Sequence, residues 1–429
     1  MGSSFFDGGV PAVRGRFGSD PITFLRRAHE RHGPVVSARP DGRMPTYVVG
    51  TSAGVGELFR RERGALEVLN TPLVHALFGR CLFNLVGDDH ARARGLLREP
   101  LARRAVGSYS SRLVAVADRH VTRWARSASF DLYQAARDLT MAMSAGVLLG
   151  IDEHDDDGPT LLAAFDQFAA ATHAPRGPLR WCSARYRVGV RSRSELRELI
   201  ERRARGARAE GDNVLSRLVL SWPAAEPAAG DVGDHMLALL IAARETTASL
   251  ITWSLVELAQ HPELRSQMGA ESRRADASPR LLAEERALPV TRAVVTETGR
   301  VHSPNMISTR RAVRPFELLG FRVKAGQRVS YSPSANHFDP CEFPAPQMFR
   351  PERFVDGLGA MRLWTFGGGV HACPGRHLAT LMAVTLLTRL QPHGRLDLLA
   401  GTPTRVRYLP TKAPLDPVPA TLTVTGAGQ

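Results

Sequence analysis

Cys373 and its neighbours are the residues whose types and spacing carry the clearest chemistry. The cysteine lies in segment 366–376, FGGGVHACPGR, shortly before the apolar segment 378–390, which has the pattern of a helix. Backbone N–H groups and the helix dipole stabilise a thiolate at a helix N-terminus. Such a thiolate can act as a nucleophile or bind a metal ion.

The glycines of this segment favour the metal ligand. Gly367, Gly368 and Gly369 let the backbone pass close to a flat, bulky group and direct N–H donors at the sulfur. A nucleophilic cysteine would need an adjacent base, and His371 keeps that alternative open because it is two residues away. A buried structural cysteine would leave the glycines and Phe366 unexplained.

The pattern Phe-Gly-x-Gly-x-His-x-Cys-x-Gly resembles the haem-binding loop of the cytochrome P450 family, in which a cysteine thiolate binds the iron. The resemblance implies that Cys373 is the iron ligand of a haem b. It also implies haem contacts from Phe366, Gly367, His371 and Gly375. The implied architecture is a mainly α fold with small β-sheets, forming a single large triangular-prism domain over residues 1–429.

A second segment supplies cations at helical spacing. His90 and Arg94 are four residues apart and lie on one face of a predicted helix that begins near two aspartates. Carboxylates bind such cations, and the segment resembles the family's His-x-x-x-Arg pair, which contacts the haem propionates. The resemblance gives the same role to His371 and to Arg310, with Arg311 as the alternative to Arg310.

A long apolar helix is predicted over residues 233–260, ending before a His-Pro pair. Its interior carries Arg244, Glu245 and Thr246, which are costly in a core helix unless they have a function. The run Ala-Ala-Arg-Glu-Thr-Thr resembles the family's oxygen-activation motif. By this resemblance, Thr246 donates a hydrogen bond next to the oxygen, and Glu245 links a water to solvent.

Two residues of this run need separate interpretation. Ala243 stands beside the haem where the family usually has glycine, so its methyl group is expected to narrow the oxygen groove or adjust substrate placement. Arg244 raises an alternative, because peroxide-driven relatives use an arginine that binds a substrate carboxylate. Since Glu245 and Thr246 are both retained, the oxygen-dependent interpretation is favoured.

Glu297 and Arg300 are three residues apart in a helix predicted over residues 289–302. Such pairs are common on surfaces and alone are a weak signal. Arg353 lies in a proline-rich stretch that leads to the cysteine loop. In the resembled family, a Glu-x-x-Arg pair and a downstream arginine form a buried ionic triad. We therefore assign the three residues to the scaffold and not to catalysis.

The rest of the chain has mostly helical patterns. These patterns cover residues 20–32, 88–152, 161–171, 193–207 and 214–220. Short strands are predicted over residues 34–38, 46–49 and 316–332, with a turn at 40–42. With 429 residues, 43% of them hydrophobic, and no internal repeat or low-complexity linker, one large domain is expected.

The net charge is +14, and all but two of the 56 basic residues are arginine. No helix-turn-helix, zinc-finger spacing or aromatic-basic interleaving accompanies the charge, so no nucleic-acid partner is expected. A basic surface instead suits an acidic ferredoxin or flavodoxin with its NAD(P)H reductase.

The first 13 residues contain neither a signal-peptide core nor the run of ~20 apolar residues that spans a membrane. Four scattered cysteines without pairing spacing fit a reducing compartment. We therefore expect a cytoplasmic monomer without a membrane anchor.

No segment names the substrate. The resemblance places eight residues in the pocket wall, namely Leu73, Val74, Phe78, Leu239, Ala242, Asn305, Met306 and Ile307. This mostly apolar set suits a lipophilic small molecule. The N-terminal sequence is similar to that of relatives that take bulky lipophiles such as terpenoids.

The resemblance as a whole implies a haem-thiolate monooxygenase, an oxidoreductase of the EC 1.14 type. It would insert one atom of O2 into a lipophilic molecule, as hydroxylases of secondary metabolism do. One alternative is the same fold catalysing oxidative coupling, ring closure or desaturation. Another is a haem-binding protein without turnover, against which the retained Glu245 and Thr246 argue.

Overall fold

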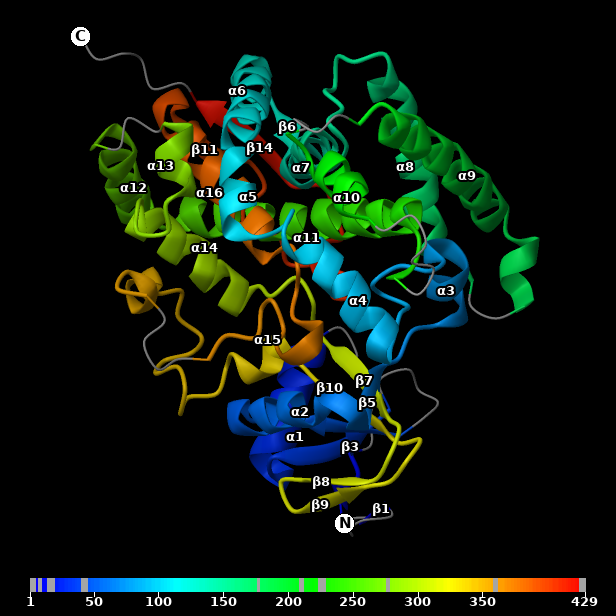
Figure 1. The fold of residues 1–429 in the computed structure, drawn as a ribbon. Helices are drawn as coiled ribbons and strands as arrows, with labels where there is room; N and C mark the ends of the chain where they lie inside the picture. Colours follow the sequence, from blue (N-terminus) through cyan, green and yellow to red (C-terminus); the bar gives the residue numbers. More distant parts are fainter. Residues whose placement is uncertain are drawn as a thin grey trace.

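The computed structural model describes residues 5–6, 10–13, 20–39, 45–175, 178–207, 212–222, 229–274, 278–357 and 362–423. Figure 1 shows a larger helical part, on the side of the C-terminus, and a smaller part rich in strands, on the side of the N-terminus. The cysteine loop connects the two parts, because its short helical turn (Gly369–His371) packs on α2 (Ser52–Ala65) while the following helix, α16 (Arg376–Leu390), packs on α6 (Ser110–Arg126).

The strand-rich part is built on a five-stranded sheet with the order β3-β4-β10-β7-β5. The strands are β3 (Val35–Ala38), β4 (Thr46–Val49), β5 (Leu66–Val68), β7 (Ser308–Ala312) and β10 (Arg328–Tyr331). Strand β10 pairs parallel to β4 and antiparallel to β7. Two strands from the second half of the chain are therefore inserted among three from the first, and they fix the position of the polypeptide that follows α14 (Pro289–Val301).

The helical part is organised around α11 (Val232–Gln260), which runs across its middle in Figure 1. This helix packs against α7 (Leu132–Leu149), α14 and α16. Apolar residues occur on all of its sides, as expected for a helix buried in the core of a large protein. Its first turn is capped by the side chain of Asp231, which accepts a hydrogen bond from the backbone N–H of Asp234 at 2.9 Å.

The other helices and strands surround the five-stranded sheet and α11. The remaining helices are α1 (Pro21–His32), α3 (Pro72–Phe78), α4 (Gly87–Arg98), α5 (Arg103–Ser108), α8 (Asp157–Ala171), α9 (Ala184–Arg205), α10 (Val214–Ser221), α12 (Pro262–Arg274), α13 (Pro279–Ala283) and α15 (Pro333–Asn336). The remaining strands are β1 (Phe5–Phe6), β2 (Val10–Pro11), β6 (Phe130–Asp131), β8 (Phe316–Leu318), β9 (Phe321–Val323), β11 (Arg395–Leu398), β12 (Val406–Arg407), β13 (Ala413–Pro414) and β14 (Pro419–Thr423). Further 3₁₀ turns are Pro178–Cys182, Pro351–Phe354 and Gln391–His393.

The predicted fold class, mainly helical with small sheets, is confirmed. The helix predicted over 233–260 is α11, and that predicted over 289–302 is α14. The helix predicted over 193–207 begins earlier, at Ala184, because Ser183 caps its N-terminus by accepting a hydrogen bond from the Tyr186 N–H. The turn predicted at 40–42 lies outside the described residues. Within the described chain, no helix has the length and apolar character needed to cross a membrane.

Glu297 and Arg300, both fully buried, form a bidentate ion pair on α14 with N–O distances of 2.7 and 2.8 Å. Arg300 also donates to the backbone carbonyls of His337, Pro346 and Met348 at 2.8–3.0 Å. Arg353 lies 3.5 Å from the Glu297 carboxylate. The structure thus brings the predicted triad together in the core.

We expect Arg300→Ala to destabilise the protein by about 3–5 kcal/mol, because it leaves the Glu297 carboxylate buried without its partner. Glu297→Ala should act in the same direction, and both variants are expected to give insoluble or haem-free protein. The measurements are the soluble yield and the urea unfolding midpoint. Arg280→Ala is the control, because Arg280 is 94% exposed on α13 and pairs only loosely with Glu284. Unfolding midpoints of the Arg300 variant equal to that of the control would contradict the scaffold role.

Candidate active site

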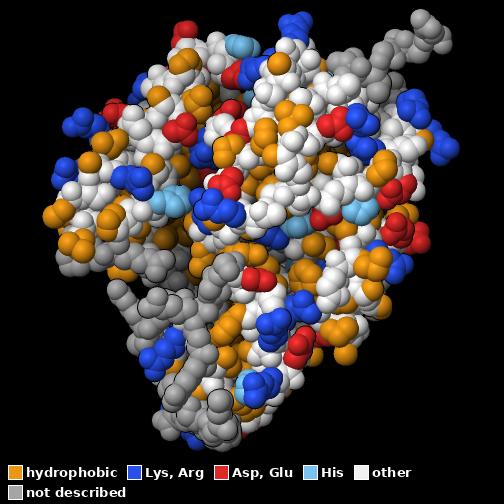
Figure 2. All heavy atoms as spheres, turned by 180° about the vertical axis from the view of Figure 1, so that it is seen from behind, with side chains coloured by type: hydrophobic (Ala, Val, Ile, Leu, Met, Phe, Trp, Pro, Cys, Tyr) orange, Lys and Arg blue, Asp and Glu red, His pale blue; other side chains and the backbone are white. Residues whose placement is uncertain are grey.

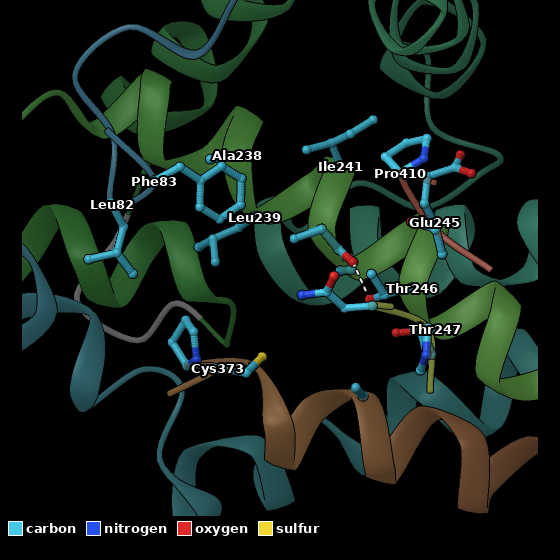
Figure 3. Close-up of a pocket in the computed structure, with 18 of the residues that line it drawn as sticks. Leu82, Phe83, Ala238, Leu239, Ile241, Glu245, Thr246, Thr247, Cys373 and Pro410 are labelled. Atoms are coloured by element: carbon cyan, nitrogen blue, oxygen red, sulfur yellow. Dashed lines mark hydrogen bonds between the residues drawn. The ribbon is translucent and has the colours of Figure 1, made fainter. Parts of the chain in front are cut away.

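A cavity of about 810 Å³ lies between α11 and the cysteine loop. Figure 3 shows the Cys373 side chain at the base of this cavity, with α11 passing above it. Leu82 and Phe83, from the segment before α4, close one side, and Pro410 approaches from the opposite side. The wall is apolar over much of its surface, with a few charged groups placed at specific points.

The cysteine loop is held by hydrogen bonds at its start and at Cys373 itself. The Cys373 N–H donates to the Phe366 carbonyl at 2.8 Å, and the Thr365 hydroxyl donates to the Gly299 carbonyl of α14 at 2.8 Å. Burial raises the pKa of the Cys373 thiol, while the backbone of Gly375 and the charge of Arg94 act in the opposite direction. The cationic neighbours and the Gly375 backbone thus favour the thiolate and oppose the effect of burial.

Three glycines of the loop are required, either by the backbone conformation or by the close approach of the loop to α2. Gly367 and Gly369 both have a φ of +64°, which side-chain-bearing residues rarely adopt. A Cβ on Gly368 would lie 2.6 Å from the ring of Phe59, and one on Gly369 would collide with the Glu62 carboxylate. The loop is thus shaped by direct packing on this helix.

All four of the predicted propionate ligands line the same cavity, namely His90, Arg94, Arg310 and His371. The rings of His90 and His371 lie 4.0 Å apart between centroids, and Arg94 donates to the Ala372 carbonyl. Burial lowers the pKa of His90 to about 4 and that of His371 to about 3, so both rings are neutral donors at pH 7. The other predicted haem contacts, Ala243, Phe366, Gly367 and Gly375, also line it.

The choice between Arg310 and Arg311 follows from the register of β7. Arg310 is 4% exposed and lines the cavity, whereas Arg311 is exposed and pairs with Glu67 at 3.1 Å. Arg310 is oriented by Glu62, whose carboxylate lies 2.6 Å from its Nε and also accepts from the backbone N–H of Val370 at 3.0 Å. The role of Glu62 could not be predicted from the sequence, because it is one acid among the arginines Arg60, Arg61 and Arg63 of α2.

Thr246 and Glu245 line the cavity from α11. The Thr246 hydroxyl donates to the Ala242 carbonyl at 2.6 Å, the bond drawn in Figure 3. The Glu245 carboxylate accepts from Arg137 Nε at 3.2 Å and Nη2 at 3.1 Å, and from the Tyr133 hydroxyl at 3.4 Å. Arg137 and Tyr133 come from α7 and were not predicted, since their role depends on the packing of two helices.

Arg244, the residue that raised the peroxide-driven alternative, is fully buried and is not among the residues that line the cavity. Its guanidinium lies over the ring of Phe165 at 5.1 Å, and its Nη1 donates to Asp166 at 2.7 Å. The side chain therefore ties α11 to α8. An arginine held in this way is not placed to bind a substrate in the cavity.

Of the eight predicted pocket residues, Val74, Phe78, Leu239, Ala242 and Asn305 line the cavity. The prediction is wrong for the other three, Leu73, Met306 and Ile307, which are not among its lining residues. Leu73 packs into the main hydrophobic core, and Met306 is fully buried. Sequence position alone could not separate these residues from their neighbours that face the cavity.

The segment after β12 is fastened behind the cavity by Lys412, which is 6% exposed. Its backbone N–H donates to the Pro304 carbonyl at 2.9 Å, and its carbonyl accepts from the Ser249 hydroxyl of α11 at 2.6 Å. Its Nζ lies 2.7 Å from His302 Nδ1, and the other nitrogen of that ring lies 2.6 Å from Glu257. Burial lowers the pKa of Lys412 to about 7.

The groups in the cavity fit a planar, iron-holding macrocycle with two carboxylates. A thiol at a helix N-terminus supplies the iron ligand, and the cluster formed by His90, Arg94, Arg310 and His371 supplies donors for the carboxylates. The sequence matches the family described as Cytochrome P450 over residues 11–402. The chain belongs to the cytochrome P450 family. It is a monooxygenase, and its family implies a haem cofactor.

Known proteins resemble the chain over most of its length. Cytochrome P450 135A1 of Mycobacterium tuberculosis is 27% identical, covering 86% of this chain and 82% of the relative. Cytochrome P450 26B1 of Homo sapiens is 28% identical and abscisic acid 8'-hydroxylase 2 of Oryza sativa subsp. indica 25% identical, covering 92% and 93% of this chain and 81% of each relative. The solved structure of a retinoic acid-bound cyanobacterial CYP120A1 superposes with a TM-score of 0.82 at 22% identity, covering 93% of this chain and 94% of the other.

We predict that Cys373→Ser abolishes the red-shifted thiolate signature of the reduced carbon monoxide complex, because serine does not supply a thiolate to iron. The measurement is the absorption spectrum of the reduced, carbon monoxide-treated protein. The substitutions Cys182→Ser and Cys341→Ser are the controls, because both cysteines are exposed. Cys81→Ser should also retain the signature. An unchanged spectrum in the Cys373 variant would refute the assignment.

Lys412 is predicted to make stability depend on pH. Its folded-state pKa of about 7 lies below the ordinary value of 10.5, so the unfolded chain binds more protons between these values. The free energy of unfolding should therefore rise with pH from about 7 to 10.5. Read in the other direction, this gain in stability is lost progressively as the pH falls from 10.5, and the loss is complete once the pH has fallen through 7. Urea unfolding midpoints across this range should rise less in Lys412→Met than in the wild type. Lys324→Met, at an exposed lysine, is the control, and equal slopes in all three proteins would contradict the prediction.

Proposed function

We propose that this protein uses haem b to insert one atom of O2 into a lipophilic small molecule. The observation that carries the proposal is that Cys373, Glu245 and Thr246 line one cavity, with the donors for two carboxylates at its edge. When bound, the haem supplies oxygen activation, and a thiolate ligand favours cleavage of the O–O bond. The polypeptide itself must orient the substrate, exclude water and deliver protons.

Proton delivery is assigned to α11. The Thr246 hydroxyl, which donates to the Ala242 carbonyl in this structure, can rotate to donate into the cavity. The Glu245 carboxylate is held by Arg137 and Tyr133 and is about 20% exposed, so it lies between the cavity and the solvent. We infer that Glu245 exchanges a proton with water while Arg137 fixes its position.

The substrate is proposed to be a lipophile with a largely hydrocarbon skeleton. Apolar side chains, among them Phe78, Phe83, Leu239 and Ile241, form much of the cavity wall, and such a lining favours apolar molecules. Two relatives carry names that point the same way, one as an abscisic acid hydroxylase and one as a retinoic acid-bound structure. Both ligands are terpenoid-type molecules, which supports hydroxylation of a terpenoid-like substrate, as in secondary metabolism.

Electrons are proposed to come from an acidic ferredoxin or flavodoxin with its NAD(P)H reductase. The net charge of +14 attracts an acidic protein over long distances and raises its rate of association. On the face that Figure 2 shows, basic and acidic side chains are interspersed, so the excess of positive charge there is spread and not gathered into one block. We propose a cytoplasmic monomer with a single domain.

We predict that Thr246→Ala retains haem and substrate binding but diverts electrons to hydrogen peroxide. Without the hydroxyl, the productive barrier rises, and a change of ~1.4 kcal/mol would already slow product formation tenfold. The measurement is the ratio of product formed to NADPH consumed, with peroxide titrated in parallel. Thr246→Ser should keep most of the coupling.

Thr296→Ala is the matched control for this experiment. The Thr296 hydroxyl makes the same type of bond, to the Arg292 carbonyl at 2.8 Å, but it lies on α14 and is not among the residues lining the cavity. If Thr246→Ala couples electrons to product as well as the wild type and this control do, the relay does not run through Thr246.

A further inference from the structure

Arg407 lines the cavity from β12, at the opposite end of the chain from most of the wall. Among the residues that the structure describes, its side chain makes no hydrogen bond or ion pair, and its Nε is buried without a partner. A buried donor without an acceptor costs free energy, because it has lost its water and gained nothing in exchange. A guanidinium in this state therefore favours any ligand that brings an acceptor to it.

The other charged side chains around the cavity have partners. Arg137 pairs with Glu245 at 3.1 Å, and Arg310 pairs with Glu62 at 2.6 Å. Asp166, the second carboxylate in the wall, accepts from the fully buried Arg244. Both wall carboxylates are thus neutralised by arginines of their own. Arg94 donates to the Ala372 carbonyl beside the cysteine loop, whereas Arg407 has neither a counter-charge nor a hydrogen-bond acceptor among the described residues.

The surroundings of Arg407 suit an anion. Burial and then the charge of Arg407 lower the pKa of His173, so that this ring is neutral at pH 7. Burial and Glu245 raise the pKa of Tyr133 to about 12, which keeps its hydroxyl protonated. Both groups line the cavity and add no negative charge to it, and the His173 ring can donate a hydrogen bond to a ligand.

Arg407 is also held in place. Strand β12 pairs antiparallel with β13, with Arg407 opposite Ala413, and the neighbouring Lys412 fastens this hairpin to α11 and to the segment after α14. Pro410, from the turn of the same hairpin, lies beside Glu245 in Figure 3, on the far side of the cavity from Leu82 and Phe83. A ligand group bound here would be fixed relative to the Cys373 sulfur.

We propose that Arg407 binds the carboxylate of an acidic lipophile and so orients its hydrocarbon part toward Cys373 and Thr246. The inference rests on the proposed function in taking this cavity as the substrate site. A single guanidinium matches a carboxylate, which it can bind through two parallel hydrogen bonds. A phosphate dianion would need further cations, and the other arginines of the wall, Arg94, Arg137 and Arg310, are already bound to protein groups. The substrate class is therefore a monocarboxylic acid with a bulky apolar skeleton.

The test compares three probes with one skeleton, farnesoic acid, methyl farnesoate and farnesol, on the haem-loaded protein at pH 7.5. Binding is measured both by the spin-state shift of the haem and by equilibrium dialysis, so it does not depend on turnover. The wild type is expected to bind the acid at least tenfold more tightly than the ester or the alcohol, since hydrogen bonds to charged groups are strong.

Three variants locate the effect. Arg407→Gln should remove the preference for the acid and leave the affinity for the ester within twofold of the wild-type value, whereas Arg407→Lys should retain part of the preference. Arg405→Gln is the matched control, because Arg405 lies two residues away, is largely exposed, pairs with Asp416 at 2.8 Å and is not among the residues lining the cavity. It should keep the full preference. The carbon monoxide spectrum of each variant checks that the haem site is intact.

The outcomes separate the two proposals. Equal affinities of the wild type for acid and ester would overturn the carboxylate site and leave the monooxygenase proposal standing, and so would an Arg407→Gln variant that keeps the preference. If the wild type binds none of the three lipophiles, both the carboxylate site and the lipophilic substrate are overturned. If it binds them but forms no oxygenated product with a surrogate reductase, the proposed function fails while the binding site survives.

Discussion

The buried ion pair between Glu297 and Arg300 is the interaction on which the position of the active site depends. Arg300 binds three backbone carbonyls between residues 337 and 348, so one charged group organises the irregular chain before the cysteine loop. His337 continues this network: its Nδ1 lies 3.1 Å from the Arg300 carbonyl, and its Nε2 accepts from the Trp364 N–H at 2.8 Å. Burial lowers the pKa of His337 to about 3, so the neutral ring can donate and accept at once. The chain leading to Cys373 is thereby fastened to α14.

The second constraint is that α11 must be a core helix and a catalytic helix at once. Its polar residues meet this demand in different ways. Arg244 points away from the cavity and pairs with Asp166, while Glu245 faces the cavity and pairs with Arg137. The Thr246 hydroxyl donates a hydrogen bond to the Ala242 carbonyl of the same helix. Arg244, Glu245 and Thr246 therefore each make at least one polar contact, which reduces the cost of burying them, and the helix is continuous from Val232 to Gln260.

A site residue could be predicted from the sequence when the residues that reveal its role lie close to it in the chain. This holds for Cys373, Thr246 and the Glu297–Arg300 pair, because the motif of each consists of consecutive residues or of residues within one helical turn. Glu62 and Arg137 could not be predicted, because their importance arises from helices that meet only in the folded chain. The pocket wall was the least predictable part. Met306 and Asn305 are adjacent in sequence, yet only Asn305 faces the cavity, and side-chain direction in an irregular segment has no periodic signal.

The charges around the cavity explain how one site can hold both a carboxylate that transfers protons and a substrate that carries another. An unshielded Glu245 would repel an acidic ligand in this low-dielectric space. The ion pair with Arg137 cancels that repulsion. The Tyr133 hydroxyl, which is neutral, donates a further hydrogen bond to the Glu245 carboxylate. Since Glu245 is paired with Arg137, it does not neutralise the positive charge of Arg407. Because each wall acid is matched to its own arginine, Arg407 is left to bind the ligand. Neutralising Arg137 should therefore weaken the binding of an acidic lipophile even though Arg137 itself need not touch it.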